Sequence, residues 1–193
     1  MTKTSAPKTS VGKSIVSVKV TLLGTKPPVW RRLLMLDTMT LADVHYAIQA
    51  AMGWEDSHLH VFHIDGRDYG DRRTVDNVAD ENRITLISIV KSGVSRFAYT
   101  YDFGDSWEHV LVIEKAQPTA PGQAYPVCVG GKRACPPEDS GGHLGYQQLL
   151  EVLADPDHPD YAEQREWIGE DLNPEAFDIN FANTLLKARF GQT

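Results

Sequence analysis

The chain has 193 residues, of which 41% are hydrophobic and 23% are charged, a composition typical of a globular protein with an ordinary apolar core. Its formal net charge of −7 argues against a nucleic-acid backbone as the main partner, because phosphate binding requires a basic surface. No apolar run approaches the roughly 20 residues that a bilayer-spanning helix needs, and no signal-peptide pattern is present. We therefore expect a cytoplasmic protein without a membrane partner, in which Cys128 and Cys135 are reduced unless they bind a metal.

Alternation of apolar and polar residues, the pattern of half-buried strands, begins after a stretch rich in Thr, Ser and Lys. That stretch, residues 1–14, predicts a disordered tail, and we expect residues 15–193 to form one domain. A nearly continuous apolar run further along the chain is typical of a central strand buried on both faces. The predicted strands are residues 16–22, 29–36, 59–64, 84–90 and the two arms of a hairpin around Gly104.

Helical spacing of apolar residues begins after Thr40, which forms a capping-box pattern with Asp43, and Gly53 ends this helix. Further helices are predicted over residues 146–154, over 161–168 and after a cap at Asp178, with one helical turn over 74–79. Residues 116–145 show no periodicity and predict a long loop, a feature that is commonly functional. This order predicts an α+β protein: a mixed or antiparallel sheet of β-grasp-like or roll type, a helix after two strands, and C-terminal helices packed on the sheet.

The hairpin over residues 99–114 carries the densest group of reactive side chains in the chain. A two-residue loop starting at Gly104 would place that glycine at a positive φ and set Asp102 and His109 on one face of the sheet. A three-residue loop would instead pair Tyr101 with His109 and turn Asp102 to the other face. The turn residues favour the two-residue loop.

Five sequence blocks stand out along the chain: PPVWRR, LADVHYAIQAAMGWEDSHLHVFHI, YDFGDSWEH, CVGGKRACPPEDSGG and DPDHPDY. Together they resemble the plasmid pRiA4b ORF-3-like family over about residues 18–186. The resemblance implies an α+β, roll-type domain, and some relatives are labelled as TnpR-type passenger proteins of insertion sequences. Some relatives also carry a cysteine where this chain has Ser140, and its absence weakens the case for a three-thiolate metal site.

Histidine and carboxylate side chains occur at metal-ligand spacing in two segments. His58 and His60 are two residues apart, so on a strand they would share a face, as a pair of metal ligands does. A hydrogen-bonded core histidine is the alternative for His60. Asp102, Asp105 and His109 would add further ligands or a general acid–base set. The competing interpretation is that both aspartates bind backbone N–H groups of their own turn while His109 fills space.

The two cysteines give a weaker metal signal. Six residues separate Cys128 from Cys135, more than the two to four of a zinc knuckle, so packing thiols are the favoured interpretation. A divalent metal such as zinc is the one cofactor that the chain suggests. The candidate ligands are His58, His60, Asp102, His109, Cys128 and Cys135.

An aromatic and acidic cleft is also predicted. Glu138 and Asp139 stand between a proline pair and a glycine pair, which is typical of a ligand-facing loop and also of a solvated loop tip. We expect this loop, the SHLH segment and the hairpin turn to meet in one pocket. The candidate cleft residues are Tyr101, Asp102, Asp105, Trp107, Glu108, His109, Glu138 and Asp139.

Two function hypotheses follow from these residues. The first is a non-enzymatic, mobile-element-associated domain that binds a small ligand or a protein in this cleft. The alternative is a metal-dependent hydrolase or nuclease-like enzyme in which Glu138 or Asp139 acts as the base. The acidic net charge and the lack of any complete catalytic motif favour the binding domain.

Overall fold

A mixed sheet of eight strands organises the computed structural model, which describes residues 14–169 and 172–191. The strand order is β5-β4-β3-β6-β7-β1-β2-β8, and neighbours are antiparallel except for the parallel pair β4 and β5. The strands are β1 (Ser14–Leu22), β2 (Trp30–Leu36), β3 (His60–Ile64), β4 (Arg67–Gly70), β5 (Ala79–Asp80), β6 (Arg96–Tyr101), β7 (Trp107–Pro118) and β8 (Val127–Lys132). Of the predicted tail, residues 1–13 lie outside the described residues, and Ser14 already belongs to β1.

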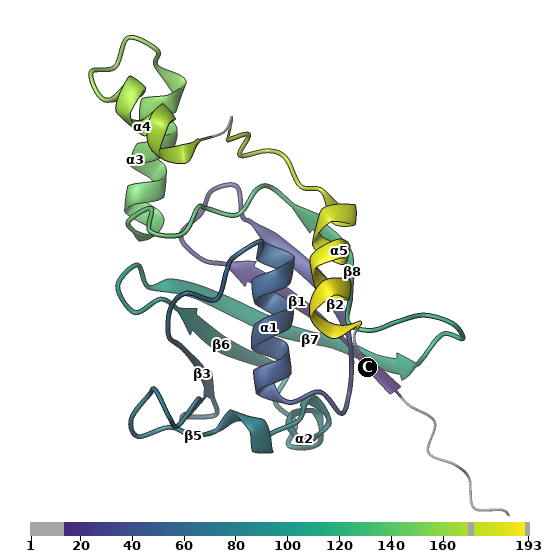
Figure 1. Cartoon of the computed structure of the whole chain (residues 1–193). Coiled ribbons are helices and arrows are strands. Elements are labelled where there is room, and N and C mark those ends of the chain that lie inside the picture. The colour runs from purple at the N-terminus through teal and green to yellow at the C-terminus, as the bar shows by residue number, and fades with distance from the viewer. Residues whose placement is uncertain (1–13, 170–171, 192–193) are drawn as a thin grey trace, which may run out of the picture.

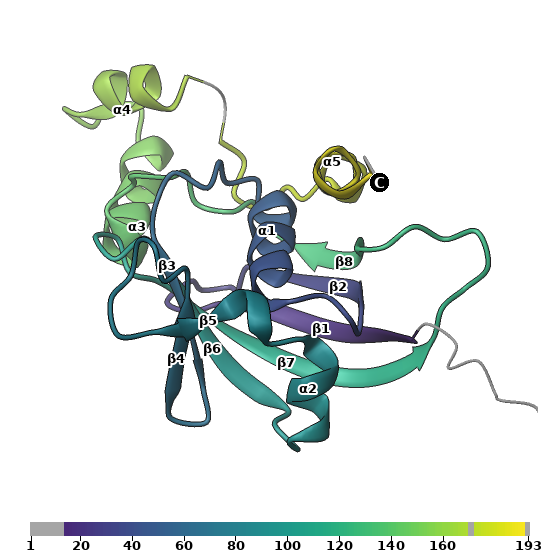
Figure 2. The ribbon, with the colours of Figure 1, turned by 60° about the horizontal axis from the view of Figure 1, so that its bottom comes forward.

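The helices are α1 (Leu41–Met52), α2 (Leu86–Lys91), α3 (Gly142–Ala154), α4 (Tyr161–Ile168) and α5 (Ile179–Phe190), with a short 3-10 helix at Glu81–Arg83. Helices α1 and α5 lie on the same side of the sheet, whereas α3 and α4 pack against each other at one end of the molecule (Figure 1, Figure 2). The predicted α+β class, with a helix after two strands, is confirmed. None of the helices in the described part of the chain is long and apolar enough to cross a membrane.

Helix α1 shows how local sequence fixes an element. The Thr40 hydroxyl accepts a hydrogen bond from the Asp43 N–H at 3.2 Å, and the Asp43 carboxylate accepts one from the Thr40 N–H at 2.8 Å. These bonds satisfy donors that a helix start leaves free. Gly53 ends the helix at φ 89° and donates its N–H to the Gln49 carbonyl, because glycine adopts a left-handed conformation without strain. The predicted helix is confirmed.

The apolar core lies between the sheet and the helices. The alternating residues Val16, Val18 and Val20 of β1 are fully buried and belong to the same cluster as Val44 and Ile48 of α1. Fully burying each such side chain contributes about 1.5–3 kcal/mol relative to leaving it exposed. The period-two and helical patterns of the sequence therefore correspond to the two layers that face each other.

The predicted strand over residues 84–90 is wrong, because most of this run forms α2. Ser88 starts the helix by accepting a hydrogen bond from the Thr85 N–H at 3.1 Å. Leu86 and Ile89 are buried one helical turn apart while Ser88 is exposed. The nearly continuous apolar run over residues 84–90 lacks the periodicity that separates a buried strand from a short helix.

The predicted loop over residues 116–145 is also wrong in part, since it contains the end of β7, all of β8 and the start of α3. Strand β8 pairs with β2, but Gly130 and Gly131 interrupt any alternation of side chains. A Cβ atom at Gly131 would lie 2.4 Å from the Phe177 ring, so the glycine permits a close approach. The predicted helical turn over 74–79 is a hydrogen-bonded turn followed by the first residue of β5.

Both predicted registers of the β6–β7 hairpin are wrong. Tyr101 pairs with Trp107, so the loop comprises the five residues 102–106. Asp102 at φ 56° and Ser106 at φ 55° take the left-handed conformation that was expected at Gly104. The Asp102 carboxylate accepts the Gly104 N–H at 2.9 Å, an Asx-type bond that sets the turn.

Candidate functional site

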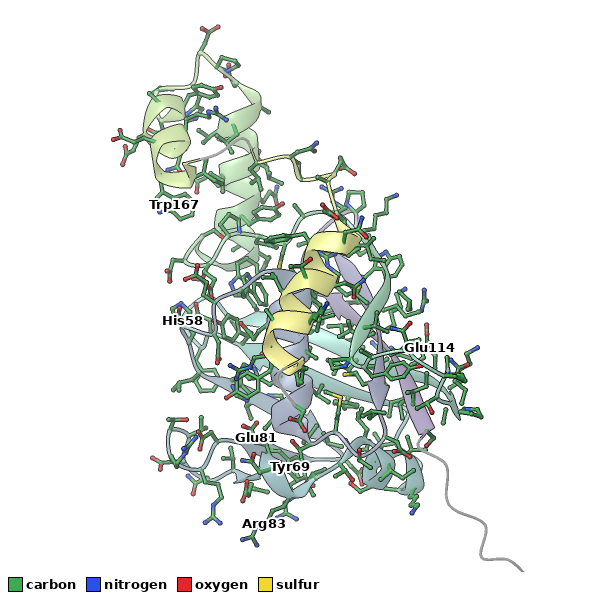
Figure 3. All side chains as sticks on the ribbon, turned by 45° about the vertical axis from the view of Figure 1, so that its right-hand side comes forward. His58, Tyr69, Glu81, Arg83, Glu114 and Trp167 are labelled. Carbon is green, nitrogen blue, oxygen red and sulfur yellow. The ribbon has the colours of Figure 1, made fainter. Side chains whose placement is uncertain are left out.

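Three segments meet beside the hairpin turn: the loop before β3, the turn itself, and the loop between β8 and α3. The Nε2 atom of His58 lies 3.2 Å from Oδ1 of Asp139 and 3.8 Å from Oδ2 of Asp102. One possible ligand atom from each residue lies within 4.8 Å of the other two. We name His58, Asp102 and Asp139 the His-Asp-Asp cluster, and His58 lies below the α3–α4 pair in Figure 3.

The cluster is buried on one side and open on the other. Asp102 is 7% exposed, whereas the Asp139 side chain is 72% exposed. The Nε2 atom of His58 is shielded from solvent and makes no hydrogen bond with the described residues. The geometry therefore offers one nitrogen and two oxygen atoms around a point that solvent reaches from the Asp139 side.

Both aspartates of the cluster have left-handed backbone conformations, Asp102 at φ 56° and Asp139 at φ 59°. Aspartate tolerates this region better than most residues, because its short polar side chain can bind nearby backbone groups. Asp102 directly follows Tyr101, the last paired residue of β6. The left-handed backbone conformation there leaves the Asp102 carboxylate 3.8 Å from His58 Nε2.

Hydrogen bonds of Tyr101 and Glu138 connect the loop before β3, strand β6 and the loop between β8 and α3. The buried Tyr101 hydroxyl accepts hydrogen bonds from the N–H groups of Ser57 at 3.0 Å and His58 at 3.3 Å, and it donates to Glu138. Glu138 also accepts the Glu55 N–H at 3.0 Å. Burial and the hydrogen bond to Glu138 raise the pKa of Tyr101 well above its usual range, so the hydroxyl remains a donor. Tyr101 and Glu138, two of the predicted cleft residues, are therefore engaged in hydrogen bonds within the protein.

The other predicted cleft residues lie in different environments. Asp105 accepts the Gly141 N–H at 3.0 Å, next to the start of α3. Trp107 and His109 are at most 1% exposed and pack in the core, while Glu108 is exposed on the opposite face of β7. His109 donates from Nδ1 to the Trp107 carbonyl at 2.9 Å, and burial lowers its pKa to about 4. Trp107 and His109 therefore act as core residues.

His60 does not lie beside His58, because His58 precedes β3 while His60 is its first residue. The His60 side chain is 9% exposed, hydrogen bonds through Nε2 to Glu81 at 2.8 Å and stacks on His45. The structure thus gives His60 the environment of a hydrogen-bonded core histidine.

The two cysteines are also separate from the cluster. Cys128 is buried in β8, where its backbone exchanges two hydrogen bonds with the Asn183 side chain of α5. Burial raises the pKa of both Cys128 and Cys135, which favours the neutral thiol form of each. Among the residues that the structure describes, the His-Asp-Asp cluster is the group of His, Cys, Asp and Glu side chains close enough to share an ion.

A buried polar network inside the domain was not predicted from the sequence. The Tyr99 hydroxyl lies 2.7 Å from His45 Nδ1 and accepts from Gln49 at 3.1 Å, and His45 Nε2 lies 2.8 Å from Asp56. Because the Asp56 carboxylate accepts, His45 Nε2 carries the proton and Nδ1 accepts the Tyr99 hydroxyl proton. Burial lowers the pKa of His45 and favours this neutral form. The signal in the sequence was the spacing of His45 and Gln49, four residues apart on one helix face.

The sheet, its helices and the loop cluster define an α+β domain with a His and Asp site at one end. The chain belongs to the plasmid pRiA4b ORF-3-like protein family, whose model matches residues 14–181, and the predicted resemblance is confirmed. The chain is similar to the uncharacterized protein y4hQ of Sinorhizobium fredii, with 43% identity over 159 residues and 81% of each sequence covered. It is also similar to the crystal structure of MM3350, a protein of unknown function from Methanosarcina mazei Go1. That comparison has a TM-score of 0.82 and 38% identity, and covers 88% of this chain and 98% of the other.

Proposed function

We propose that this protein is a ligand-binding domain built around a divalent cation, with zinc as the first ion to test. His58, Asp102 and Asp139 are its proposed protein ligands. The observation that carries the proposal is the convergence of these three side chains, from separate segments, within 4.8 Å of one another. Imidazole nitrogen and carboxylate oxygen are zinc ligands in many proteins.

Two of the three separations between possible ligand atoms in the cluster are compatible with a single ion. Two ligands bound to zinc at about 2.0–2.2 Å in a tetrahedral arrangement lie about 3.4 Å apart. The 3.2 Å separation of His58 and Asp139 meets this value, and the 3.8 Å separation of His58 and Asp102 needs a small contraction. Three protein ligands leave one tetrahedral position for water or for a group of the bound partner.

The surroundings favour binding over catalysis. Hydrolysis at a metal-bound water needs a free general base close by. Two nearby carboxylates are engaged, Glu138 with the Tyr101 hydroxyl and Asp105 with the Gly141 N–H. We therefore propose that the open coordination position takes a donor atom of a small molecule or of a protein side chain.

The family's name is that of a plasmid reading frame, which supports a role on mobile elements. We propose such an association for this protein, and the resemblance to TnpR-type passenger proteins points the same way. Sequencing the genes on either side of this reading frame tests it. Transposase or plasmid-replication genes are expected there, and ordinary metabolic operons would contradict the proposal.

Zinc titration of chelator-treated protein tests the metal site. We expect one zinc ion per chain by calorimetry, and an affinity at least about 100-fold lower in His58→Gln, which loses a direct ligand. Asp102→Asn removes the charge but keeps a residue that tolerates the left-handed conformation, and it should also weaken binding. Zinc-loaded protein should not hydrolyse ester or phosphodiester substrates.

His63→Gln is the matched control, because His63 forms a comparable imidazole–carboxylate pair with Asp68 at 2.7 Å on the surface. This variant should bind zinc like the unmodified chain. Unchanged zinc affinity in His58→Gln would contradict the assignment of the ligands. Turnover that disappears in His58→Gln but not in His63→Gln would favour the hydrolase alternative.

A further inference from the structure

A pocket of about 380 Å³, separate from the His-Asp-Asp cluster, lies between the loop that joins β1 to β2 and the first half of α3. Its lining includes Lys26, Arg133, His143 and Tyr146, and it includes no aspartate or glutamate. This is an unusual lining for a chain with a formal net charge of −7. The charged side chains that line the pocket, Lys26 and Arg133, are therefore positive although the chain as a whole is negative.

The pocket holds two buried hydrogen-bond donors, of which the Tyr146 hydroxyl has no partner and the Arg133 guanidinium has only an ion pair with one exposed carboxylate. Tyr146 is 4% exposed and Arg133 is 6% exposed. Among the described residues, the Tyr146 hydroxyl and the Arg133 Nη1 atom make no hydrogen bond. Arg133 Nη1 does lie 2.7 Å from the exposed Glu175 carboxylate, with which it forms an ion pair at the edge of the pocket. Buried polar groups are normally paired, so the unpaired Tyr146 hydroxyl beside a buried guanidinium requires an explanation.

We propose that this pocket binds a small organic anion through a carboxylate or phosphate group, with Arg133 and Tyr146 as the buried donors and Lys26 at the entrance. A guanidinium group matches the paired oxygens of both anions, and the tyrosine hydroxyl supplies one more donor. The volume lies within the usual range for small-molecule sites, about 300–1,000 Å³, so an organic body accompanies the anionic group.

Supporting features fit a built site. Burial raises the pKa of Tyr146, which keeps the hydroxyl protonated as a donor. Gly24 has φ +79°, and a Cβ atom there would lie 2.7 Å from the Cβ of His143. The glycine thus lets the β1–β2 loop approach the first turn of α3 and form the rim of the pocket. The proposed anion site shares no residue with the His-Asp-Asp cluster.

Calorimetric titration of the full chain with inorganic phosphate, and separately with acetate, tests the proposal. Chelator-treated protein at constant ionic strength separates specific binding from metal effects and from screening. We expect saturable binding of one anion per chain. Tyr146→Phe should weaken it about tenfold, because one hydrogen bond to a charged group is lost. The tighter of the two probes identifies the ligand as a phosphate or a carboxylate compound.

Lys26→Gln and Lys132→Gln form a matched pair, because both lysines are exposed and only Lys26 lines the pocket. The first variant should weaken binding several-fold and the second should not change it. Failure of both anions to bind saturably would overturn the proposal, as would equal affinity in Tyr146→Phe and the unmodified chain. Binding lost in His58→Gln would move the anion to the metal cluster and overturn the pocket, whereas a failed zinc titration leaves this test unaffected.

Discussion

The imidazole rings of His45 and His60 lie parallel, with centroids 3.5 Å apart and planes inclined by 6°. Each ring binds a different carboxylate through Nε2, His45 to Asp56 and His60 to Glu81, both at 2.8 Å. Burial lowers the pKa of His45 against the opposing hydrogen bond to Asp56, and the stacked His60 ring adds to the lowering. The pair links α1 to β3 through polar groups inside the core.

Removing the carboxylate partner of His45 should destabilise the protein. We expect Asp56→Ala to lower the free energy of unfolding by about 1–2 kcal/mol, because the buried His45 Nε2 loses its acceptor. Asp56→Asn keeps an acceptor and a residue suited to the left-handed conformation at φ 61°, and should cost about half as much. Urea denaturation at pH 7 measures both. Equal losses in the two variants would show that the hydrogen bond is not the source of the effect.

Acidification should destabilise the fold through His109. Burial lowers the pKa of this histidine from its ordinary value of 6.5 to about 4. Between these values the unfolded chain binds a proton that the folded chain does not, so the free energy of unfolding falls as the pH falls. The full effect, reached below about pH 4, is about 3 kcal/mol.

The slope of stability against pH is the readout for this prediction. His109→Gln removes the titrating group and should flatten the curve between about pH 6.5 and 4, even if the variant is less stable at every pH. A curve for His109→Gln that is parallel to that of the unmodified chain would contradict a neutral, buried His109.

The elements that the sequence predicted well have signals within a few residues of each other. Thr40 and Asp43 cap α1 reciprocally, and Asp178 caps α5 by accepting N–H groups of its first turn, so both starts were readable from the pattern. The missed elements depend on distant partners. Strand β8 exists because Gly130 and Gly131 pair with β2, and the hairpin register follows from an Asx bond inside its loop.

The candidate site was likewise only partly predictable, because its residues come from segments that are distant in the sequence. The structure brings one residue from each expected segment together, His58 from SHLH, Asp102 from the turn and Asp139 from the proline-rich loop. Closely spaced polar residues next to glycine and proline allowed these segments to be predicted from the sequence. Which residue of each segment points inward depends on backbone angles and on burial, and these left His60 and His109 in the core. Periodicity carries no information about such angles.

The Tyr101 hydroxyl should contribute both to stability and to the shape of the proposed metal site. Tyr101→Phe removes a group that binds two backbone N–H groups and Glu138, and we expect a loss of about 2 kcal/mol. Zinc affinity should also fall, because the hydroxyl fixes the backbone of His58. The control is Tyr125→Phe, whose hydroxyl binds one N–H in a surface loop and should cost less than about 0.5 kcal/mol. Equal melting temperatures for the two variants would count against this role.

Gly142→Ala should lower the free energy of unfolding more than Gly53→Ala does, although both substitutions place alanine at a positive φ. Gly142 and Gly53 have φ values of +67° and +89°, so alanine at either position is strained by about 1 kcal/mol. At Gly53 a Cβ atom would meet nothing within 4 Å, whereas at Gly142 it would lie 2.4 Å from the Asp105 carbonyl oxygen. The second variant must therefore push α3 away from the hairpin turn, and we expect a total loss of about 3 kcal/mol. Thermal denaturation compares the two directly, and similar losses would mean that the first turn of α3 does not rest against the backbone of Asp105.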